Sequence, residues 1–542
     1  MATVKSIAVI GGGPAGVIAA EVFSKNSAKY HKVRVFEKRD SVGGVWNYSA
    51  NMKQPTYIPF GPDLDHIDPI LTPPDVLPAR VKSTPIEQWL GSPAYDDLKT
   101  NVTNKVMCFS DAPFYPNEPS LKQQQNCISN NNNDFHYDRF VLHSKVKKYL
   151  EEYSKPAREL GLYVFNTSVE EVQLISINPP KYRLTLRQST SSHQQKTDYW
   201  WSEDFDAIVV ASGQFNVPLL PEIPGLPQYW AKHPERCIHS KYFKNNLMYK
   251  DSVTVVVGCG VSGNDITLRV AKTARKIYQS KRNPSRWEKI PGYKYPEGVI
   301  FKPEIAEILS DGRALFQDGT STECAPDYFI FATGYQHDYK FLRKNFPGIL
   351  TEDDKLADVF LGTFSMRYPN MAFIAGERMG SWAAFRAYEY QACAIDGVFS
   401  RRTRLPNYDY MMRKNKELED FLQRVETMPF QSMLIVRKQA VEFAKLAGGF
   451  SRDNDNDNDN NKTKKKTTTS KKSSSSSSEQ QVNKAPKWTH ELDVELLQSS
   501  FDYLVECVFE GEYPDQDKIN EICRLLSVPM FSPQDDAIYD KQ

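Results

Sequence analysis

The chain has 542 residues, 40% of them hydrophobic, and this length and composition predict two to four globular domains. The 68 basic and 67 acidic residues leave a net charge of +1, which argues against a protein that binds nucleic acid or a membrane through a basic patch. The eight cysteines include no C-x-x-C pair, so we expect no metal site or redox-active dithiol of that kind. No apolar run of about 18 residues is present, so we expect no transmembrane segment.

The N-terminal region is predicted to bind a dinucleotide. An apolar run, Ile7–Ile10, is followed by the glycine turn Gly11–Gly16, the helical stretch Val17–Phe23 and a second apolar-rich run, Val33–Phe36. Glu37 ends that run, 21 residues after the last glycine of the turn. Strand, G-x-G-x-x-G turn, helix, strand and acid form the context that the dinucleotide-binding fingerprint requires. A tight strand–helix turn without a ligand is the alternative.

Each glycine of this fingerprint has an expected task. Gly11 allows the tight turn, Gly13 lets the backbone approach a pyrophosphate, and Gly16 lets the helix pack closely on the strand. The helix N-terminus then faces the phosphates with free N–H groups, and the carboxylate of Glu37 is placed to bind ribose hydroxyls. Trp46, which follows two further glycines, is either a core aromatic or part of the ligand site.

The middle of the chain is predicted to alternate irregular segments with short elements. Two segments are expected to be irregular: a proline-rich surface excursion at Asn47–Tyr95 and a low-complexity loop at Gln123–Asn133. They are followed by a helix at Phe140–Ala157 and a strand at Leu162–Phe165. We then expect an antiparallel hairpin around Arg183–Leu186 and Trp200, and a buried strand with a glycine end at Asp206–Gly213. No Ser-His-Asp set and no paired carboxylates are evident in these segments.

A second fingerprint begins with the apolar strand Val253–Val257. The turn Gly258–Gly263 leads into a helix, and the next predicted strand, Lys276–Tyr278, runs into Ser280-Lys281-Arg282 instead of an acid. An acid there would repel a 2′-phosphate, whereas serine and two cations suit one, so we predict NADP rather than NAD. A solvated basic loop is the alternative. The expected contacts are Gly258, Gly260, Ser262, Gly263, Asp265, Ser280 and Arg282.

The order of these patterns predicts an α/β fold with two nested Rossmann-like dinucleotide-binding domains and a helical C-terminal segment. Asp327–Tyr335 is a buried strand that repeats the glycine end of Asp206–Gly213, so each fingerprint is followed by one such strand. After it we expect a strand at Met371–Gly376, a helix at Ala383–Phe399, an amphipathic helix containing Leu418, Phe421, Leu422 and Val425, a disordered polar segment at Arg452–Asn483, and a last helical segment around Leu492–Leu504.

With both fingerprints placed, the chain resembles the flavin-containing monooxygenases, and most closely their fungal branch, the thiol-specific monooxygenases. The resemblance covers about Lys5 to Pro406, with gaps at Asn47–Ala94 and Gln123–Asp134. It rests on Gly11–Gly16, Glu37 with Gly43–Trp46, Thr100-Asn101 with Met107–Asp111, Gly258–Gly263, and Phe331–Tyr335.

One family motif, F-x-G-x-x-x-H-x-x-x-F/Y-K/R, is present only in its second half. His239 and Phe243-Lys244 match, whereas His233 and Glu235 replace the Phe and the Gly. This departure concerns the packing of a linker more than the chemistry, and we expect His239 to be structural. Phe243-Lys244 favours the branch that oxygenates sulfur or nitrogen over the Baeyer–Villiger branch, whose motif ends with Trp.

The resemblance implies that the first fingerprint holds FAD and the second holds NADPH. NADPH would reduce FAD, O₂ would add at C4a of the flavin, and the hydroperoxide would oxygenate a soft nucleophile, namely a small thiol, sulfide or amine, as in N,N-dimethylaniline monooxygenases. Asn101 matches the family's active-site asparagine, whose amide can donate and accept hydrogen bonds near the flavin; a turn asparagine is the alternative. The implied FAD contacts are Gly11, Gly13, Pro14, Ala15, Gly16, Glu37, Lys38, Gly44, Val45, Trp46, Val169 and Gln391, of which Gln391 could equally be an ordinary helix residue.

The corresponding domains are 1–213 for the first part of the FAD-binding domain, 214–334 for the inserted NADPH-binding domain, 335–450 for the second part with its helices, 451–486 for the low-complexity linker and 487–542 for the C-terminal helical segment. We expect small-molecule partners and O₂, no metal, and a cytoplasmic location or one peripheral to the endoplasmic reticulum; a homo-oligomer is compatible with the sequence. Two other functions remain open: a flavin-dependent disulfide reductase, which the missing C-x-x-C disfavours, and a non-catalytic nucleotide-binding redox sensor.

Overall fold

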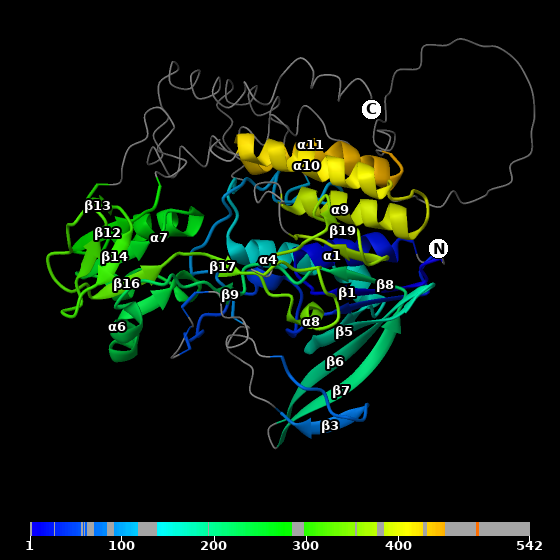
Figure 1. Ribbon diagram of the computed structural model, residues 1–542, viewed down its shortest axis with the longest axis horizontal. Coiled ribbons are helices and arrows are strands. Elements are labelled where there is room, and N and C mark those ends of the chain that lie inside the picture. Colours follow the sequence, from blue (N-terminus) through cyan, green and yellow to red (C-terminus); the bar gives the residue numbers. More distant parts are fainter. Residues whose placement is uncertain are drawn as a thin grey trace, which may run out of the picture.

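The computed structural model describes residues 3–26, 28–55, 58, 60–61, 70–83, 91–116, 138–192, 195–283, 297–352, 355–376, 384–425, 431–449 and 484–486. They form two mostly parallel sheets side by side, with helices on one face of the first sheet and an antiparallel sheet on its other face (Figure 1). Each of the two sheets contains one of the glycine fingerprints, so the predicted α/β architecture is confirmed.

The first sheet has seven strands in the order β18-β19-β20-β8-β1-β2-β4. The strand β1 (Ser6–Ile10) lies inside this sheet and runs parallel to both neighbours, β2 (Lys32–Phe36) and β8 (Ala207–Val210). The outer strands are β4 (Tyr163–Val164), β18 (Val359–Phe360), β19 (Phe364–Ser365) and β20 (Met371–Phe373). Because β18–β20 follow the second sheet in the sequence, the chain leaves the first sheet after β8 and returns later to complete it.

The strand β1 is buried on both faces, which explains its continuous apolar sequence. Ile7 and Val9 pack against the helices, whereas Ala8 and Ile10 pack against the antiparallel sheet on the other side. Successive strand residues point to opposite faces, so a strand covered on both sides needs apolar residues throughout. The covering helices are α1 (Pro14–Ser24), α9 (Ala384–Phe399) and α11 (Gln431–Ala447), with α9 between the other two (Figure 1).

The antiparallel sheet confirms the predicted hairpin and extends it. Arg187 pairs with Trp200 in the middle of the two long strands. The strand order is β3-β7-β6-β5, with β5 (Thr167–Ile177), β6 (Pro180–Ser192), β7 (Gln195–Phe205) and β3 (Ala79–Lys82). Strand β3 lies inside the stretch expected to be a surface excursion, where Ile58 and Tyr95 are also buried. That expectation is wrong there, because β3 pairs with β7, and the side chains of Ile58 and Tyr95 complete the cores of sheets formed elsewhere in the chain.

The second sheet is entirely parallel and has the order β10-β16-β11-β12-β13. Its strands are β10 (Cys237–His239), β11 (Val253–Val257), β12 (Lys276–Ser280), β13 (Val299–Lys302) and β16 (Tyr328–Phe331), and α7 (Val261–Ala271) follows β11. The two segments that join the sheets pair with each other as β9 (Val217–Pro218) and β17 (Tyr335–Gln336). A hairpin, β14 (Ile305–Ile308) with β15 (Ala314–Phe316), completes this part.

The predicted helix at 140–157 is divided in two. Helix α4 (His143–Tyr153) ends before Ser154, and α5 (Lys155–Glu159) begins there with Pro156 in its first turn, where a missing N–H is tolerated. The other helices are α6 (Leu226–Lys232), α8 (Lys340–Arg343) and α10 (Tyr408–Val425). The expected loop at 123–133, polar segment at 452–483 and helix at 492–504 lie outside the described residues.

Candidate active site

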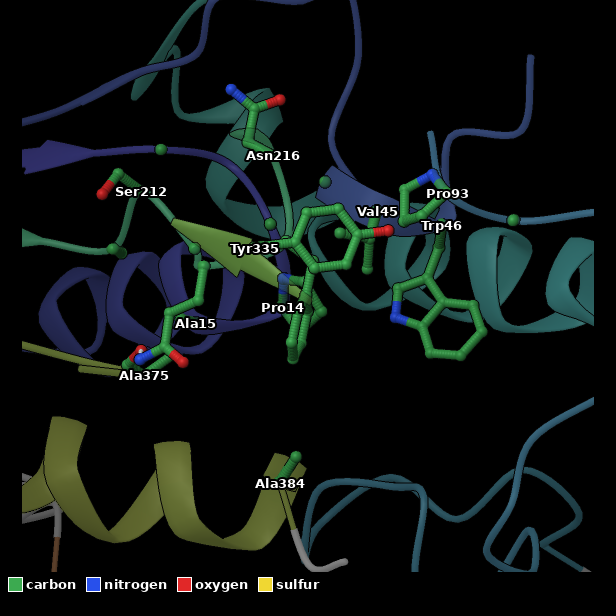
Figure 2. Close-up of a pocket in the computed structure, with 18 of the residues that line it drawn as sticks. Pro14, Ala15, Val45, Trp46, Pro93, Ser212, Asn216, Tyr335, Ala375 and Ala384 are labelled. Carbon is green, nitrogen blue, oxygen red and sulfur yellow. Dashed lines mark hydrogen bonds between the residues drawn. The ribbon is translucent and has the colours of Figure 1, made fainter. Parts of the chain in front are cut away.

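A cavity of about 1090 Å³ lies between the two sheets and is lined by both fingerprints. Figure 2 shows Pro14, Ala15, Val45 and Trp46 on one side, Tyr335 projecting into the space, and Ala384 of α9 opposite them. This size exceeds that of an ordinary single-ligand pocket, which is at most about 1000 Å³. The cavity can therefore accommodate two extended ligands that meet near its middle.

The glycines fit a dinucleotide, because packing explains only some of them. A Cβ on Gly16 or Gly263 would lie 1.8 or 2.4 Å from the carbonyl oxygen of the first glycine in its own turn, so helix packing requires both. A Cβ on Gly13 would meet nothing closer than 3.6 Å, and one on Gly260 nothing within 4 Å. Both of these open glycines line the cavity. No protein atom therefore explains why these two positions are glycine. A pyrophosphate lying against the backbone explains it, because a side chain would stand in its way.

Glu37 lies at the cavity wall, as the fingerprint predicts. Its Oε2 accepts a 2.6 Å hydrogen bond from the Gly12 amide, and its Oε1 accepts one of 2.8 Å from the Arg39 amide. The residue is 4% exposed, so the carboxylate is held rigidly at the end of β2. Each oxygen retains a further lone pair, which suits a ribose hydroxyl.

The second fingerprint supplies the other part of the wall. Gly260, Ser262 and Asp265 line the cavity, whereas Gly258 and Gly263 lie beneath it at the turn. Burial raises the pKa of the Asp265 carboxyl, which the ion pair with Arg269 at 3.3 Å partly opposes. Arg269 also lines the cavity; it lies four residues after Asp265, one helical turn away, so the helical period could have revealed it.

The structure identifies which residue of the second fingerprint occupies the place of Glu37. The Gly11 amide donates to the carbonyl of Phe36 at 2.9 Å, and the Gly258 amide donates to that of Ser280 at 2.8 Å. These equivalent bonds align the two strand ends, so Lys281 stands where Glu37 stands in the first fingerprint.

The two side chains expected to contact the 2′-phosphate both have partners within the described chain. Ser280 is 2% exposed and donates its hydroxyl to the Pro303 carbonyl at 3.0 Å, so it is a packing residue. Arg282 is not part of the described cavity wall; its Nε donates to Glu304 Oε1 at 2.7 Å. Glu304 lies 22 residues further along the chain, so no local pattern indicated this partner.

Asn101 lines the cavity at the end of the segment 91–100. Thr100 fixes the turn, since its amide donates to the Val141 carbonyl at 2.9 Å and its hydroxyl donates to the Val102 carbonyl at 2.7 Å. The side-chain amide of Asn101 forms no hydrogen bond with the residues that the structure describes. Both its donor and its acceptor groups can therefore serve a ligand.

The two remaining FAD contacts have different outcomes. Val169 lines the cavity, as expected. Gln391 does not: it is 0% exposed, and its amide donates to Thr363 Oγ1 at 2.8 Å and accepts from the Ala375 amide at 3.2 Å. Its expected place at the wall is corrected, because both ends of the amide are used within α9 and the neighbouring strands. Gln391 instead supports Ala375, which lines the cavity.

A buried ionic cluster beside Val169 was not predicted. Arg187 contacts Glu170 at 2.8 Å and Asp198 at 3.2 Å, and all three are less than a tenth exposed. Lys340 Nζ lies 3.8 Å from the second Glu170 oxygen. Arg187, Glu170 and Lys340 line the cavity. They come from β6, β5 and α8, so only tertiary packing brings their charges together.

His239 is structural, as predicted. Its Nε2 lies 2.9 Å from the Gly334 carbonyl, and its Nδ1 accepts from the Lys241 amide at 3.1 Å, which identifies a neutral ring that donates from Nε2. Complete burial lowers the pKa of His239 to about 3. The ring thus joins β10 to the segment that leads into β17.

The cysteines of the described chain are not placed for redox chemistry with a cofactor. None of these five forms a disulfide, and none of them lines the cavity. Within the same ranges, no cluster of three His, Cys, Asp or Glu side chains could hold a metal ion. No helix of the described chain has both the length and the apolarity needed to cross a membrane.

Comparison with known protein families decides between the remaining candidates. Residues 91–310 match the family described as flavin-binding monooxygenase-like, and residues 9–64 match an NAD(P)-binding Rossmann-like domain. Over residues 91–310 the chain is therefore similar to the flavin-binding monooxygenase-like family. It is therefore a flavin-dependent monooxygenase, and its cofactors are FAD and NADPH.

Relatives of this monooxygenase-like protein include plant enzymes. It is 27% identical over 413 residues to the flavin-containing monooxygenase FMO GS-OX-like 8 of Arabidopsis thaliana. The aligned region covers 76% of this chain and 78% of the relative. It is 28% identical over 411 residues to FMO GS-OX5 of the same plant, covering 75% and 76%.

Two solved structures share the fold. The S-allyl-L-cysteine S-oxygenase of Allium sativum superposes with a TM-score of 0.63 at 21% identity, over 96% of this chain and 98% of that one. Tmm from a Pelagibacter species superposes with a TM-score of 0.59 at 20% identity, over 82% and 86%. At these identities the likeness concerns the architecture alone.

Proposed function

We propose that this monooxygenase uses NADPH in preference to NADH to oxygenate the sulfur or nitrogen of a small thiol, sulfide or amine, as the thiol-oxidising fungal branch does. For a sulfide the balance is R₂S + O₂ + NADPH + H⁺ → R₂SO + NADP⁺ + H₂O. The observation that carries the proposal is that both fingerprints open onto one cavity with Asn101 in its wall. The Allium sativum protein of the same fold is an S-oxygenase, which supports sulfur as the atom that is oxidised.

The cofactors supply the redox and oxygen chemistry, and the chain supplies binding, orientation and exclusion of water. Glu37 and the open Gly13 hold the dinucleotide of the first fingerprint, and Gly260 receives that of the second. Trp46, Tyr335 and Asn101 line the same cavity as both fingerprints, and Tyr335 projects into it (Figure 2). The aromatic walls exclude water there.

Lys281 supports the preference for NADPH, because it stands in the place that an acid would occupy to bind the 2′-hydroxyl of NADH. A disulfide reductase has no support, since no cysteine lines the described cavity wall. A redox sensor needs the same cofactor site but no turnover, so an activity assay distinguishes it from a monooxygenase.

The test measures NADPH oxidation, O₂ uptake and product together for the FAD-loaded protein. The panel contains a thiol, an aryl methyl sulfide and a tertiary amine, such as N,N-dimethylaniline. We expect one O₂ consumed and one S- or N-oxide formed per NADPH. NADPH oxidation that requires a disulfide and no O₂ would identify a reductase, and binding without turnover of any compound would identify a sensor.

A further inference from the structure

An acid that belongs to neither fingerprint lies at the edge where the 2′-phosphate of NADP is expected. Strands β12 and β13 are parallel, with Ser280 paired to Lys302, so they end at the same edge of the sheet. Glu304 lies two residues beyond the end of β13. Its Oε1 accepts from Arg282 Nε at 2.7 Å, so the arginine expected to bind the phosphate is paired with a carboxylate.

Glu304 is the better-anchored member of this ion pair. The Gln317 amide donates to the Glu304 carbonyl at 2.9 Å, and the Gln317 side chain lies 3.3 Å from its Oε2. The side chain of Glu304 is 35% exposed, whereas that of Arg282 is 79% exposed. The carboxylate is therefore held against the hairpin that follows β13, and the guanidinium reaches toward it from the end of β12.

We propose that Glu304 is a specificity-determining residue, which competes with the 2′-phosphate of NADP for Arg282 and so reduces the preference for NADP over NAD. The inference rests on the proposed use of NADPH at this edge. A phosphate that carries nearly two negative charges cannot approach Arg282 closely without also approaching Glu304, and the like charges repel. NAD lacks that phosphate, so its binding is nearly independent of the pair.

The experiment measures dissociation constants for NADP⁺ and NAD⁺ by calorimetry on the FAD-loaded protein. Glu304→Gln keeps the shape of the side chain and its contact with Gln317 but removes the charge. We expect NADP⁺ to bind about two- to fivefold more tightly, the range for an exposed charge interaction, with NAD⁺ changed by less than about twofold. Glu323→Gln is the matched control, because it removes another exposed carboxylate of the same domain, the one paired with Lys276 at 2.5 Å; both constants should stay at their wild-type values.

Two further variants locate the effect. Arg282→Ala should weaken NADP⁺ binding by about ten- to a hundredfold, the range for a charge-assisted hydrogen bond, and spare NAD⁺. The double variant Arg282→Ala/Glu304→Gln is compared with Arg282→Ala alone. Without the guanidinium, removing the carboxylate should tighten NADP⁺ binding less than it does in the wild-type background, because only the repulsion between the phosphate and the carboxylate is relieved. Such coupling is what direct competition for one guanidinium requires.

Several results would overturn the inference. Weaker NADP⁺ binding by Glu304→Gln would mean that Glu304 orients Arg282 for the phosphate, and an unchanged constant would mean that the pair has no role. If Glu304→Gln tightened the binding of NADP⁺ and NAD⁺ equally, or if Glu323→Gln tightened NADP⁺ binding as much as Glu304→Gln, the effect would come from the overall charge of the domain. If Arg282→Ala binds NADP⁺ normally, the phosphate lies elsewhere and the proposed NADPH preference fails there, whatever Glu304→Gln shows.

Discussion

Gly13 and Gly260 occupy equivalent places in the two fingerprints and lead to a paired prediction. The space beside each is open to a Cβ, so alanine at either position fits the protein itself. We expect Gly13→Ala to fold but to be purified with little FAD, because the added methyl group lies where the pyrophosphate must approach. Gly260→Ala should retain its flavin and lose affinity for NADP⁺.

The readouts are the flavin-to-protein absorbance ratio and the NADP⁺ dissociation constant, with circular dichroism to confirm folding. Gly16→Ala is the control for a packing glycine, since its Cβ would lie 1.8 Å from a carbonyl oxygen and should destabilise the fold itself. A full complement of flavin in Gly13→Ala would contradict the assignment of the first fingerprint.

Asn101 carries the prediction about oxygen chemistry. Its amide lines the cavity and is not used by the described part of the chain, so its removal should leave hydride transfer possible but should fail to hold oxygen at the reacting centre. We expect Asn101→Ala to keep oxidising NADPH while product falls and hydrogen peroxide rises. A lost hydrogen bond to a reactive oxygen anion costs about 2–4 kcal/mol, which would make peroxide the main product.

Asn104→Ala tests whether the effect belongs to the site. Asn104 is in the same segment but is 2% exposed, and its amide donates to the Asp138 carbonyl at 3.2 Å. This variant should lose stability without losing coupling. The assay compares NADPH consumed, peroxide released and substrate oxidised; wild-type coupling in Asn101→Ala would remove Asn101 from the catalytic machinery.

At the scale of elements, the segment 92–98 joins the two halves of the molecule. Tyr95 and Leu98 pack in the core of the second sheet, whereas Val102, just beyond Asn101, packs in the core of the first. Lys244 holds this segment, donating to the carbonyls of Ser92 at 2.9 Å and Ala94 at 2.7 Å. Asn101 thus lies where the chain passes from one core to the other.

The partly buried amine of Lys244 gives this contact a pH dependence. Burial lowers the pKa of Lys244 from 10.5 to about 8, although Asp96 acts in the opposite direction. Between these two values only the unfolded chain keeps the proton, so the contribution of Lys244 to the free energy of unfolding rises with pH above about 8. Because the side chain is partly exposed, solvent screening limits this gain to about 1 kcal/mol.

The measurement is the difference in urea unfolding free energy between the wild type and Lys244→Met from pH 7.5 to 10. We expect the unfolding free energy of the wild type to rise relative to that of the variant across this range, because methionine does not titrate. Lys250→Met is the control, since Lys250 is exposed, and its difference from the wild type should be flat. A flat difference for Lys244→Met would show that the amine keeps its ordinary pKa.

At the scale of the whole molecule, the polar segment 453–478 joins two docked ends. The segment contains no apolar residue. The Ala485 amide donates to the Gly449 carbonyl at 3.2 Å, and Ala485 is 0% exposed in the core beside α9 and α11. Deleting Asp453–Ser478 leaves residues 450–452 and 479–483 to join ends that already touch, so we expect flavin content and melting temperature to stay nearly unchanged.

Ala485→Asp is the matched control for that deletion. A charge at a fully buried position should lower the melting temperature, because no partner compensates its desolvation. Differential scanning calorimetry and the flavin absorbance ratio measure both variants. Loss of flavin on deletion would show that the polar segment contributes to the fold or the cofactor site.

Sequence alone was sufficient for the parts of this protein that depend on local backbone geometry. Both glycine turns, the acid at the end of β2 and the departure from the first sheet after β8 were predicted, because spacing along a few turns of chain determines them. Asn101 was also singled out by its neighbours in the chain, and it lines the cavity.

Only the tertiary structure decided the contacts between residues far apart in the chain. Glu304 reaches Arg282 because β12 and β13 are in parallel register, and Gln391 is withdrawn from the wall because Thr363 and Ala375 use its amide. The buried Arg187 cluster likewise collects charges from four elements, β5, β6, β7 and α8. Such contacts are set by strand register and side-chain packing over long sequence separations, and no periodicity or spacing within one segment encodes them.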